Sequence, residues 1–178
     1  VTAGEVSWHL DAATGFITDW VSDGRALLGA PVADCFVRAP LDNDICSSEV
    51  DNPSPEAWLA KWQAAGLFDV EHRCAGVEVK GATVISQHEY LNDTGVAIRS
   101  VWTQTFDTAG GVDIAIEVSV DPEMSPLPRV GMRLLLCDKP EAVSWLGRGP
   151  HENYPDRKLS ADLGDWSCDR QAMQTPYV

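Results

Sequence analysis

Positive charge is scarce in this sequence. Its 178 residues include 13 Lys and Arg against 27 Asp and Glu, which gives a formal net charge of −14. Nucleic acids and anionic membrane surfaces attract basic proteins, so this balance predicts that the chain binds neither of them. A neutral ligand such as a sugar is compatible with the charge.

The cysteines lack the spacing of a disulfide framework. The chain has five of them and no CxxC pair, at Cys35, Cys46, Cys74, Cys137 and Cys168. An odd, dispersed set is typical of reduced thiols, and it favours a cytoplasmic protein.

Histidine spacing of the zinc-binding kind is also missing. No second histidine follows His151 four residues later, and His9, His72 and His88 share no ligand spacing. We therefore predict no metal site in this chain.

Long apolar runs are absent as well. No stretch approaches the ~20 residues that a membrane-spanning helix needs. The opening, Val1 to Glu5, has neither the basic start nor the apolar core of a signal peptide. Because the chain starts at Val rather than Met and stops among β-forming residues at Val178, we expect it to be a piece of a longer one.

Alternation of apolar and polar residues dominates what is present. It is cleanest from Val112 to Val120, where every second residue is Val or Ile. Similar runs joined by turn sequences predict strands over residues 6–10, 16–21, 25–28, 31–38, 70–80, 82–91, 96–106, 112–120, 130–136 and 142–146.

One helix is predicted over residues 54–66. Ser54 suits the N-cap, an apolar stripe includes Trp58 and Trp62, and Gly66 is placed to end it. Residues 42–50 lack a period and predict a loop. Long strands with a single helix predict an all-β protein, an antiparallel sandwich with residues 1–178 in one domain. The seven tryptophans lie mostly on strand or helix faces, which favours a place in the core.

Two polar stretches stand out against this pattern. Residues 146–157 read LGRGPHENYPDR, and residues 38–45 read RAPLDNDI. Glu152 and Asp156 could brace a loop through Arg148 and Arg157, or they could be the paired carboxylates of a glycosidase. The acids of the second stretch suit either an Asx-stabilised loop or a ligand-facing one, and they lack the further ligands of an EF-hand.

Together these motifs resemble the C-terminal, small-chain domain of the large β-galactosidases of glycoside hydrolase family 2. The resemblance is carried by RAPLDNDI at 38–45, WLAKWQAAG at 58–66, VSWLGRGPHENYPDR at 143–157 and TPYV at 175–178, with a similar opening at 15–28. It implies a galactose-mutarotase-like antiparallel supersandwich that is incomplete at its C-terminal end. Uncovered strand edges would then favour self-association into a homo-oligomer.

The resemblance also implies a function. The catalytic glutamates belong to a separate TIM-barrel domain, so this chain is expected to hold no catalytic residue and to be inactive alone. It would border the sugar site of the intact galactosidase and stabilise its assembly, with the barrel domain and a galactoside as partners. The implied substrate loop is Asp44, Ile45, Cys46, Ser47, Ser48 and Glu49. Cys46 stands where the family often has glycine.

Further residues have structural or possible binding roles. They are Arg38, Asp42, Asn43, His151, Glu152, Asn153, Tyr154, Asp156 and Arg157. The family commonly uses Mg²⁺ and Na⁺ bound elsewhere, so we expect no cofactor in this chain.

Two other functions stay open at this point. A stand-alone carbohydrate-binding module would need an exposed aromatic platform. A mutarotase-like epimerase would need a histidine and a carboxylate converging on one pocket, for which His151 or His88 with Glu152 are the candidates.

Overall fold

The computed structural model describes residues 1–46, 53–122, 124, 126–154 and 157–173. These residues form two compact units, Val1–Cys137 and Asp138–Val178, which are described separately below. The predicted all-β class is confirmed, because every paired strand in the described residues is antiparallel.

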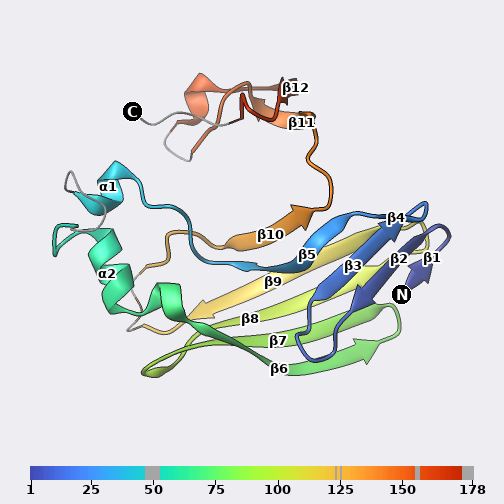
Figure 1. Ribbon diagram of the computed structural model, residues 1–178, viewed down its shortest axis with the longest axis horizontal. Coiled ribbons are helices and arrows are strands. Elements are labelled where there is room, and N and C mark those ends of the chain that lie inside the picture. The colour runs from blue at the N-terminus through green and yellow to red at the C-terminus, as the bar shows by residue number, and fades with distance from the viewer. Residues whose placement is uncertain (47–52, 123, 125, 155–156, 174–178) are drawn as a thin grey trace. The chain divides into compact units, whose positions relative to one another are not determined.

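The elements follow one another in a strand-rich order (Figure 1). The strands are β1 (Thr2–Ala3), β2 (Val6–Leu10), β3 (Ile17–Ser22), β4 (Arg25–Ala26), β5 (Leu28–Cys35), β6 (Glu71–Lys80), β7 (Thr83–Asn92), β8 (Gly95–Phe106), β9 (Val112–Val120), β10 (Gly131–Leu136), β11 (Ala142–Gly149) and β12 (Asp162–Asp169). The helices are α1 (Asp42–Ile45), α2 (Trp58–Ala64) and the 3₁₀ turns η1 (Leu67–Asp69) and η2 (Lys158–Ser160).

The first unit is a sandwich built from three antiparallel sheets. One sheet has the order β1-β2-β3-β4, a second has the order β6-β7-β8-β9, and β10 pairs with β5. Buried side chains of the early strands pack against those of β7 and β8. This core consists of Trp8, Phe16, Ile17, Leu28, Val32, Val84, Trp102 and Phe106. The alternation that predicted the strands thus places their apolar faces between the layers.

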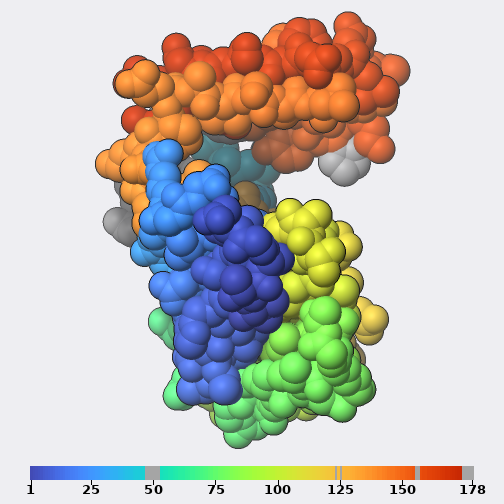
Figure 2. Space-filling view, turned by 90° about the vertical axis from the view of Figure 1, so that its right-hand side faces the viewer, coloured from blue at the N-terminus to red at the C-terminus, as the bar shows by residue number. Residues whose placement is uncertain are grey.

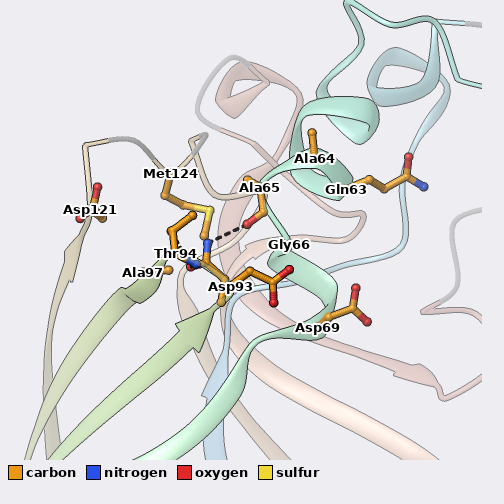
Figure 3. Close-up of a pocket in the computed structure, with 11 residues that line it drawn as sticks. Gln63, Ala64, Ala65, Gly66, Asp69, Asp93, Thr94, Ala97, Asp121 and Met124 are labelled. Carbon is orange, nitrogen blue, oxygen red and sulfur yellow. Dashed lines mark hydrogen bonds between the residues drawn. The ribbon is translucent and has the colours of Figure 1, made fainter.

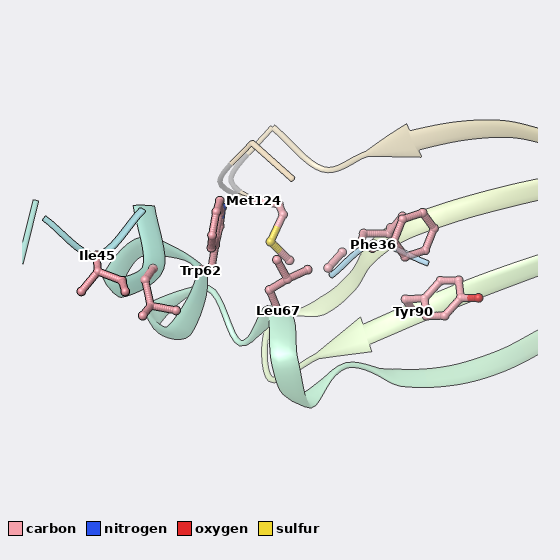
Figure 4. Close-up of a cluster of buried hydrophobic side chains, with 9 residues drawn as sticks. Phe36, Ile45, Trp62, Leu67, Tyr90 and Met124 are labelled. Atoms are coloured by element: carbon pink, nitrogen blue, oxygen red, sulfur yellow. The ribbon is translucent and has the colours of Figure 1, made fainter. Parts of the chain in front are cut away.

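A second core cluster lies beside the helices (Figure 4). The side chains of Ile45, Trp62 and Leu67 pack with Tyr90 of β7 and with Met124. The indole N–H of Trp62 donates a 2.7 Å hydrogen bond to the carbonyl of Pro126. This cluster attaches the two helices to the end of the large sheet.

Figure 2 shows the N-terminal strands (blue) lying against the turn between β8 and β9 (yellow). A Cβ placed on Gly110 in this turn would lie 2.8 Å from Cγ2 of Val6, and Gly110 has φ of +93°. Glycine alone meets both the close approach and the left-handed conformation without strain.

Polar groups inside the sandwich converge on Asp34 of β5. Its carboxylate accepts hydrogen bonds from the Tyr90 hydroxyl at 2.7 Å, the Ser100 hydroxyl at 2.5 Å and the Trp102 indole N–H at 3.0 Å. Burial and the charge of Asp34 raise the pKa of Tyr90, so its hydroxyl remains a donor. One carboxylate therefore joins β5 to both β7 and β8.

A pair of histidines lies in the same interior. His88 is 1% exposed, stacks on Phe16 at 4.2 Å between ring centroids, and hydrogen-bonds to His72 at 3.0 Å and to Ser86 at 2.8 Å. Burial and, second to it, the charge of His72 lower the pKa of His88 to about 4. Burial also lowers the pKa of His72, although the charge of Asp34 opposes that shift.

The second unit contains the hairpin of β11 and β12. Its register places Trp145 opposite Trp166 and Gly147 opposite Gly164. The sequence predicted β11 but not β12, because residues 162–169 mix Gly and Asp with single apolar residues and give no clear period.

Three other predictions need correction. Residues 42–45 were assigned to a loop but form α1, so the described residues hold two α-helices rather than one. The helix predicted over 54–66 begins only at Trp58, because the carbonyl of Ser54 accepts the N–H of Ala57 in a preceding turn. Among the tryptophans Trp8, Trp62 and Trp102 are buried, whereas Trp58 is 43% exposed.

All five cysteines are free. In the part of the chain that the structure describes, no helix is long and apolar enough to cross a membrane.

The buried histidines predict a stability that falls with acidification. Because the pKa of His88 is about 4 in the fold, below the ordinary 6.5, the unfolded chain takes up its proton first. The stabilisation is complete above about pH 6.5 and is lost as the pH falls toward 4, by about 3 kcal/mol. Urea unfolding between pH 7 and pH 4 measures this loss.

The matched comparison is His88→Gln against His9→Gln. We expect the buried substitution to flatten the pH dependence, whereas the exposed one on β2 leaves it unchanged. Equal slopes for His88→Gln and the parent chain would contradict the assignment.

Candidate functional site

The turn at residues 38–46 is built around one ion pair. The guanidinium of Arg38 donates to both carboxylate oxygens of Asp44, at 2.5 and 3.1 Å. The same carboxylate accepts the backbone N–H of Leu41 at 2.8 Å, and the guanidinium lies 5.7 Å from the ring centroid of Trp62. The Arg38–Asp44 pair therefore closes the turn and fixes it to α2.

The environment of Asp44 keeps it ionised. Burial alone would raise its pKa, but the hydrogen bonds from Arg38 and Leu41 and the charge of Arg38 outweigh burial and hold the pKa below the ordinary range. A carboxylate that is fully engaged in this way has a structural role. It is not placed to exchange protons with a ligand.

The predicted substrate loop divides into buried and exposed residues. Asp44 and Ile45 are 6% and 5% exposed and point into the fold, whereas Asp42, Asn43 and Cys46 are exposed. Ser47, Ser48 and Glu49 lie outside the described residues. Of this loop, the structure therefore places only Cys46 on the surface.

Cys46 adopts a backbone conformation that suits glycine. It ends α1 with φ of 52° and ψ of 28°, in the left-handed region. Its thiol donates to the carbonyl of Asn43 at 3.3 Å, and this hydrogen bond lies within the turn. A non-glycine residue costs about 1–2 kcal/mol in this region, so the chain carries local strain where it leaves the turn.

The second polar stretch lies in the unit Asp138–Val178. The guanidinium of Arg148 donates to the carbonyls of Lys158 at 3.1 Å and Ala161 at 2.8 Å. The ring nitrogens of His151 lie 2.8 Å from the Glu152 carbonyl and 2.7 Å from the Ser160 carbonyl. Arg148 and His151 thus brace the loop after β11 through backbone carbonyls, whereas the structural interpretation of this motif had the acids Glu152 and Asp156 bracing it through Arg148 and Arg157.

The remaining residues of this stretch differ in their exposure. Glu152 is half-buried, and Asn153, Tyr154 and Arg157 are exposed. Asp156 lies outside the described residues. The separation of Glu152 from Asp156, which a glycosidase pair would fix, is therefore not defined.

Figure 3 shows a cavity between the end of α2, η1 and the turn from β7 to β8. Its volume is about 370 Å³, and Asp69, Asp93 and Asp121 lie around it. The amide of Asn92 donates to the Ala65 carbonyl at 3.0 Å on its wall. None of the described residues that line it is aromatic, so these residues offer no flat face on which a sugar would stack.

The histidines do not form an epimerase site. The ring nitrogens of His88 face His72 and Ser86 inside the core, and those of His151 face backbone carbonyls. Nor do the described residues gather three or more His, Cys, Asp or Glu side chains in a group that could hold a metal.

The interior polar network was missed from the sequence. Ser86, His88 and Tyr90 occupy alternate positions of β7, and Ser100 and Gln104 share the same face of β8. The polar residues at these inward positions could have been found from the alternation itself. Asp34, which accepts hydrogen bonds from Tyr90 and Ser100 of this set, gives no signal in an irregular strand.

The architecture is that of an all-β protein with the antiparallel sandwich fold. Residues 2–178 match the family described as the beta-galactosidase small chain, and the chain belongs to this family. The resemblance drawn from the four sequence motifs is therefore confirmed.

The relatives are longer proteins. The chain is 46% identical over 184 residues to a β-galactosidase of Aeromonas hydrophila, 40% identical over 182 residues to one of Klebsiella pneumoniae and 35% identical over 182 residues to one of Pectobacterium atrosepticum. Each alignment covers 100% of this chain and 18% of the relative. The chain thus corresponds to one segment of these enzymes.

If the Arg38–Asp44 pair holds the turn, replacing Asp44 should lower the stability of the chain. Asp44→Asn removes the charge that the half-buried Arg38 guanidinium and the Leu41 N–H both use, so we expect a loss of about 2–3 kcal/mol in the free energy of unfolding. The control is Asp42→Asn, two residues earlier and exposed, with a loss below about 0.5 kcal/mol. Urea unfolding at pH 7 compares them, and equal losses would show that the pair does not hold the turn.

Proposed function

We propose that this chain is a non-catalytic sandwich segment of a β-galactosidase, which borders the galactoside site and stabilises the assembled enzyme. The observation that carries this proposal is the match of the whole chain to 18% of the length of several β-galactosidases. The rest of such an enzyme would supply the TIM-barrel domain and its catalytic carboxylates. Retaining hydrolysis needs two of these carboxylates about 5–5.5 Å apart.

The geometry of the 38–46 turn supports the proposal that the chain borders the substrate at this turn. The Arg38–Asp44 pair and its contact with Trp62 fix the turn on the sandwich. Asp42, Asn43 and Cys46 remain exposed at its tip. We propose that the segment from Asp44 to Glu49 borders the sugar, with the Arg38–Asp44 pair setting where that segment starts.

The same proposal covers cofactors, assembly and location. Any Mg²⁺ or Na⁺ would be held by other parts of the enzyme, since the described residues offer no suitable group of ligands. The exposed apolar side chains of β10, including Leu134, Leu135 and Leu136, would support assembly with the rest of the enzyme or with a second copy. Free cysteines are in keeping with a cytoplasmic enzyme.

The test is a transplant into a relative. This chain replaces the matching segment of the Aeromonas hydrophila β-galactosidase, and hydrolysis of o-nitrophenyl β-galactoside is measured. We expect the chimera to keep activity within about tenfold of the parent, because the fold and the turn are those of the replaced segment. The 178-residue chain alone should show no hydrolysis above background.

A substitution in the chimera tests whether Glu152 takes part in catalysis. Glu152→Gln should leave kcat within about twofold, since Glu152 is assigned no catalytic role. Hydrolysis by the isolated chain that disappears with Glu152→Gln would contradict the proposal.

A further inference from the structure

The second unit contains a cavity that the proposed function does not use. It lies on one face of the β11–β12 hairpin and the loop after β11, and its volume is about 530 Å³. Cavities that bind small molecules have volumes of about 300–1,000 Å³. Its lining includes Trp145, Pro150, His151, Glu152, Asn153 and Met173.

Glycine leaves room for one indole of this hairpin. A Cβ added to Gly149 would lie 2.6 Å from Cδ1 of Trp166, whereas one added to Gly147 would lie 3.6 Å from Cδ1 of Trp145, which is an ordinary van der Waals contact. Of these two tryptophans, Trp145 lines the cavity, so its ring is the aromatic surface that the hairpin offers there.

Hydrogen bonds to the backbone hold the indole rings of Trp145 and Trp166. The indole N–H of Trp145 donates to the Arg148 carbonyl at 3.0 Å, and that of Trp166 donates to the Gly147 carbonyl at 3.1 Å. Because the backbone takes up the N–H groups, the half-buried Trp145 offers the cavity its ring. A flat ring of this kind suits the C–H face of a pyranose, which is apolar and carries no charge.

The rim of the cavity carries a group that suits sugar hydroxyls. The exposed amide of Asn153 can both donate and accept hydrogen bonds. Arg148, which also lines the cavity, donates from Nη1 to two backbone carbonyls, so this nitrogen braces the loop. A neutral polyhydroxylated ligand can use the amide and needs no charged partner.

We propose that this cavity is a sugar-binding site, in which a pyranose stacks on Trp145 and hydrogen-bonds to Asn153. The described residues that line the site run from Trp145 to Asn153 and from Cys168 to Met173, and none of them belongs to the 38–46 turn. Binding would be weak, with a dissociation constant on the order of 1–10 mM, because one ring and a few polar groups form the contact.

The experiment follows the indole N–H signals of the ¹⁵N-labelled 178-residue chain by NMR. Methyl β-galactopyranoside is titrated, and inorganic phosphate is titrated separately. We expect a saturable shift of the Trp145 signal with the sugar and none with phosphate. The Trp58 signal, from an exposed ring on α2, should not move.

Variants distinguish a binding site from a general effect. Trp145→Ala should weaken binding at least tenfold, Trp145→Phe should retain part of it, and Trp58→Ala should leave it unchanged. Asn153→Ala tests the same site without touching the hairpin core, with a loss of about three- to tenfold expected.

Three results would overturn the proposal. The first is the absence of a saturable Trp145 shift with the sugar. The second is an Asn153→Ala variant that binds as tightly as the parent chain while its β11–β12 amide signals keep their positions. A response to phosphate in place of the sugar would assign the cavity to anions and would also contradict it.

Discussion

The carboxylate of Asp34 is the interaction on which the first unit depends. It accepts hydrogen bonds from Tyr90, Ser100 and Trp102, and these three donors are buried on the strands of the facing sheet. Desolvated donors of this kind cost free energy unless they find an acceptor. One charged side chain thus ties β5 across the sandwich, where apolar packing alone would leave the alignment of the layers less defined.

This constraint reaches the candidate site through the chain itself. β5 ends at Cys35, and the next residues enter the 38–46 turn through Phe36, which packs edge-on against Tyr90 at 5.0 Å between ring centroids. Asp34 therefore sets where Arg38 begins the turn, and the Arg38–Asp44 pair then closes it. The position proposed for the substrate loop is thus a consequence of buried electrostatics several residues upstream.

Much of the sandwich could be predicted from the sequence because alternation reports directly which face of a strand is buried. The range of β9 was predicted as it occurs, and β6 to β8 differ by a residue or so. Short elements held by side-chain contacts could not be predicted in this way. α1 depends on Asp44 bonding to Leu41, and α2 starts late because a turn precedes it. The RAPLDNDI motif singled out Arg38 and Asp44, but it assigned Asp44 to a substrate loop, so their ion pair, like the role of Asp34, required the fold.

The most direct measurement is the free energy of unfolding of Asp34→Ala by urea at pH 7, beside Asp113→Ala on the exposed side of β9. If Asp34 joins the two sheets, its loss leaves buried donors unpaired, and stability falls by about 3–5 kcal/mol while Asp113→Ala changes it by less than about 0.5 kcal/mol. Hydrogen exchange at the Trp102 indole should accelerate in the same variant. A loss below about 1 kcal/mol, with that indole still protected, would contradict the account.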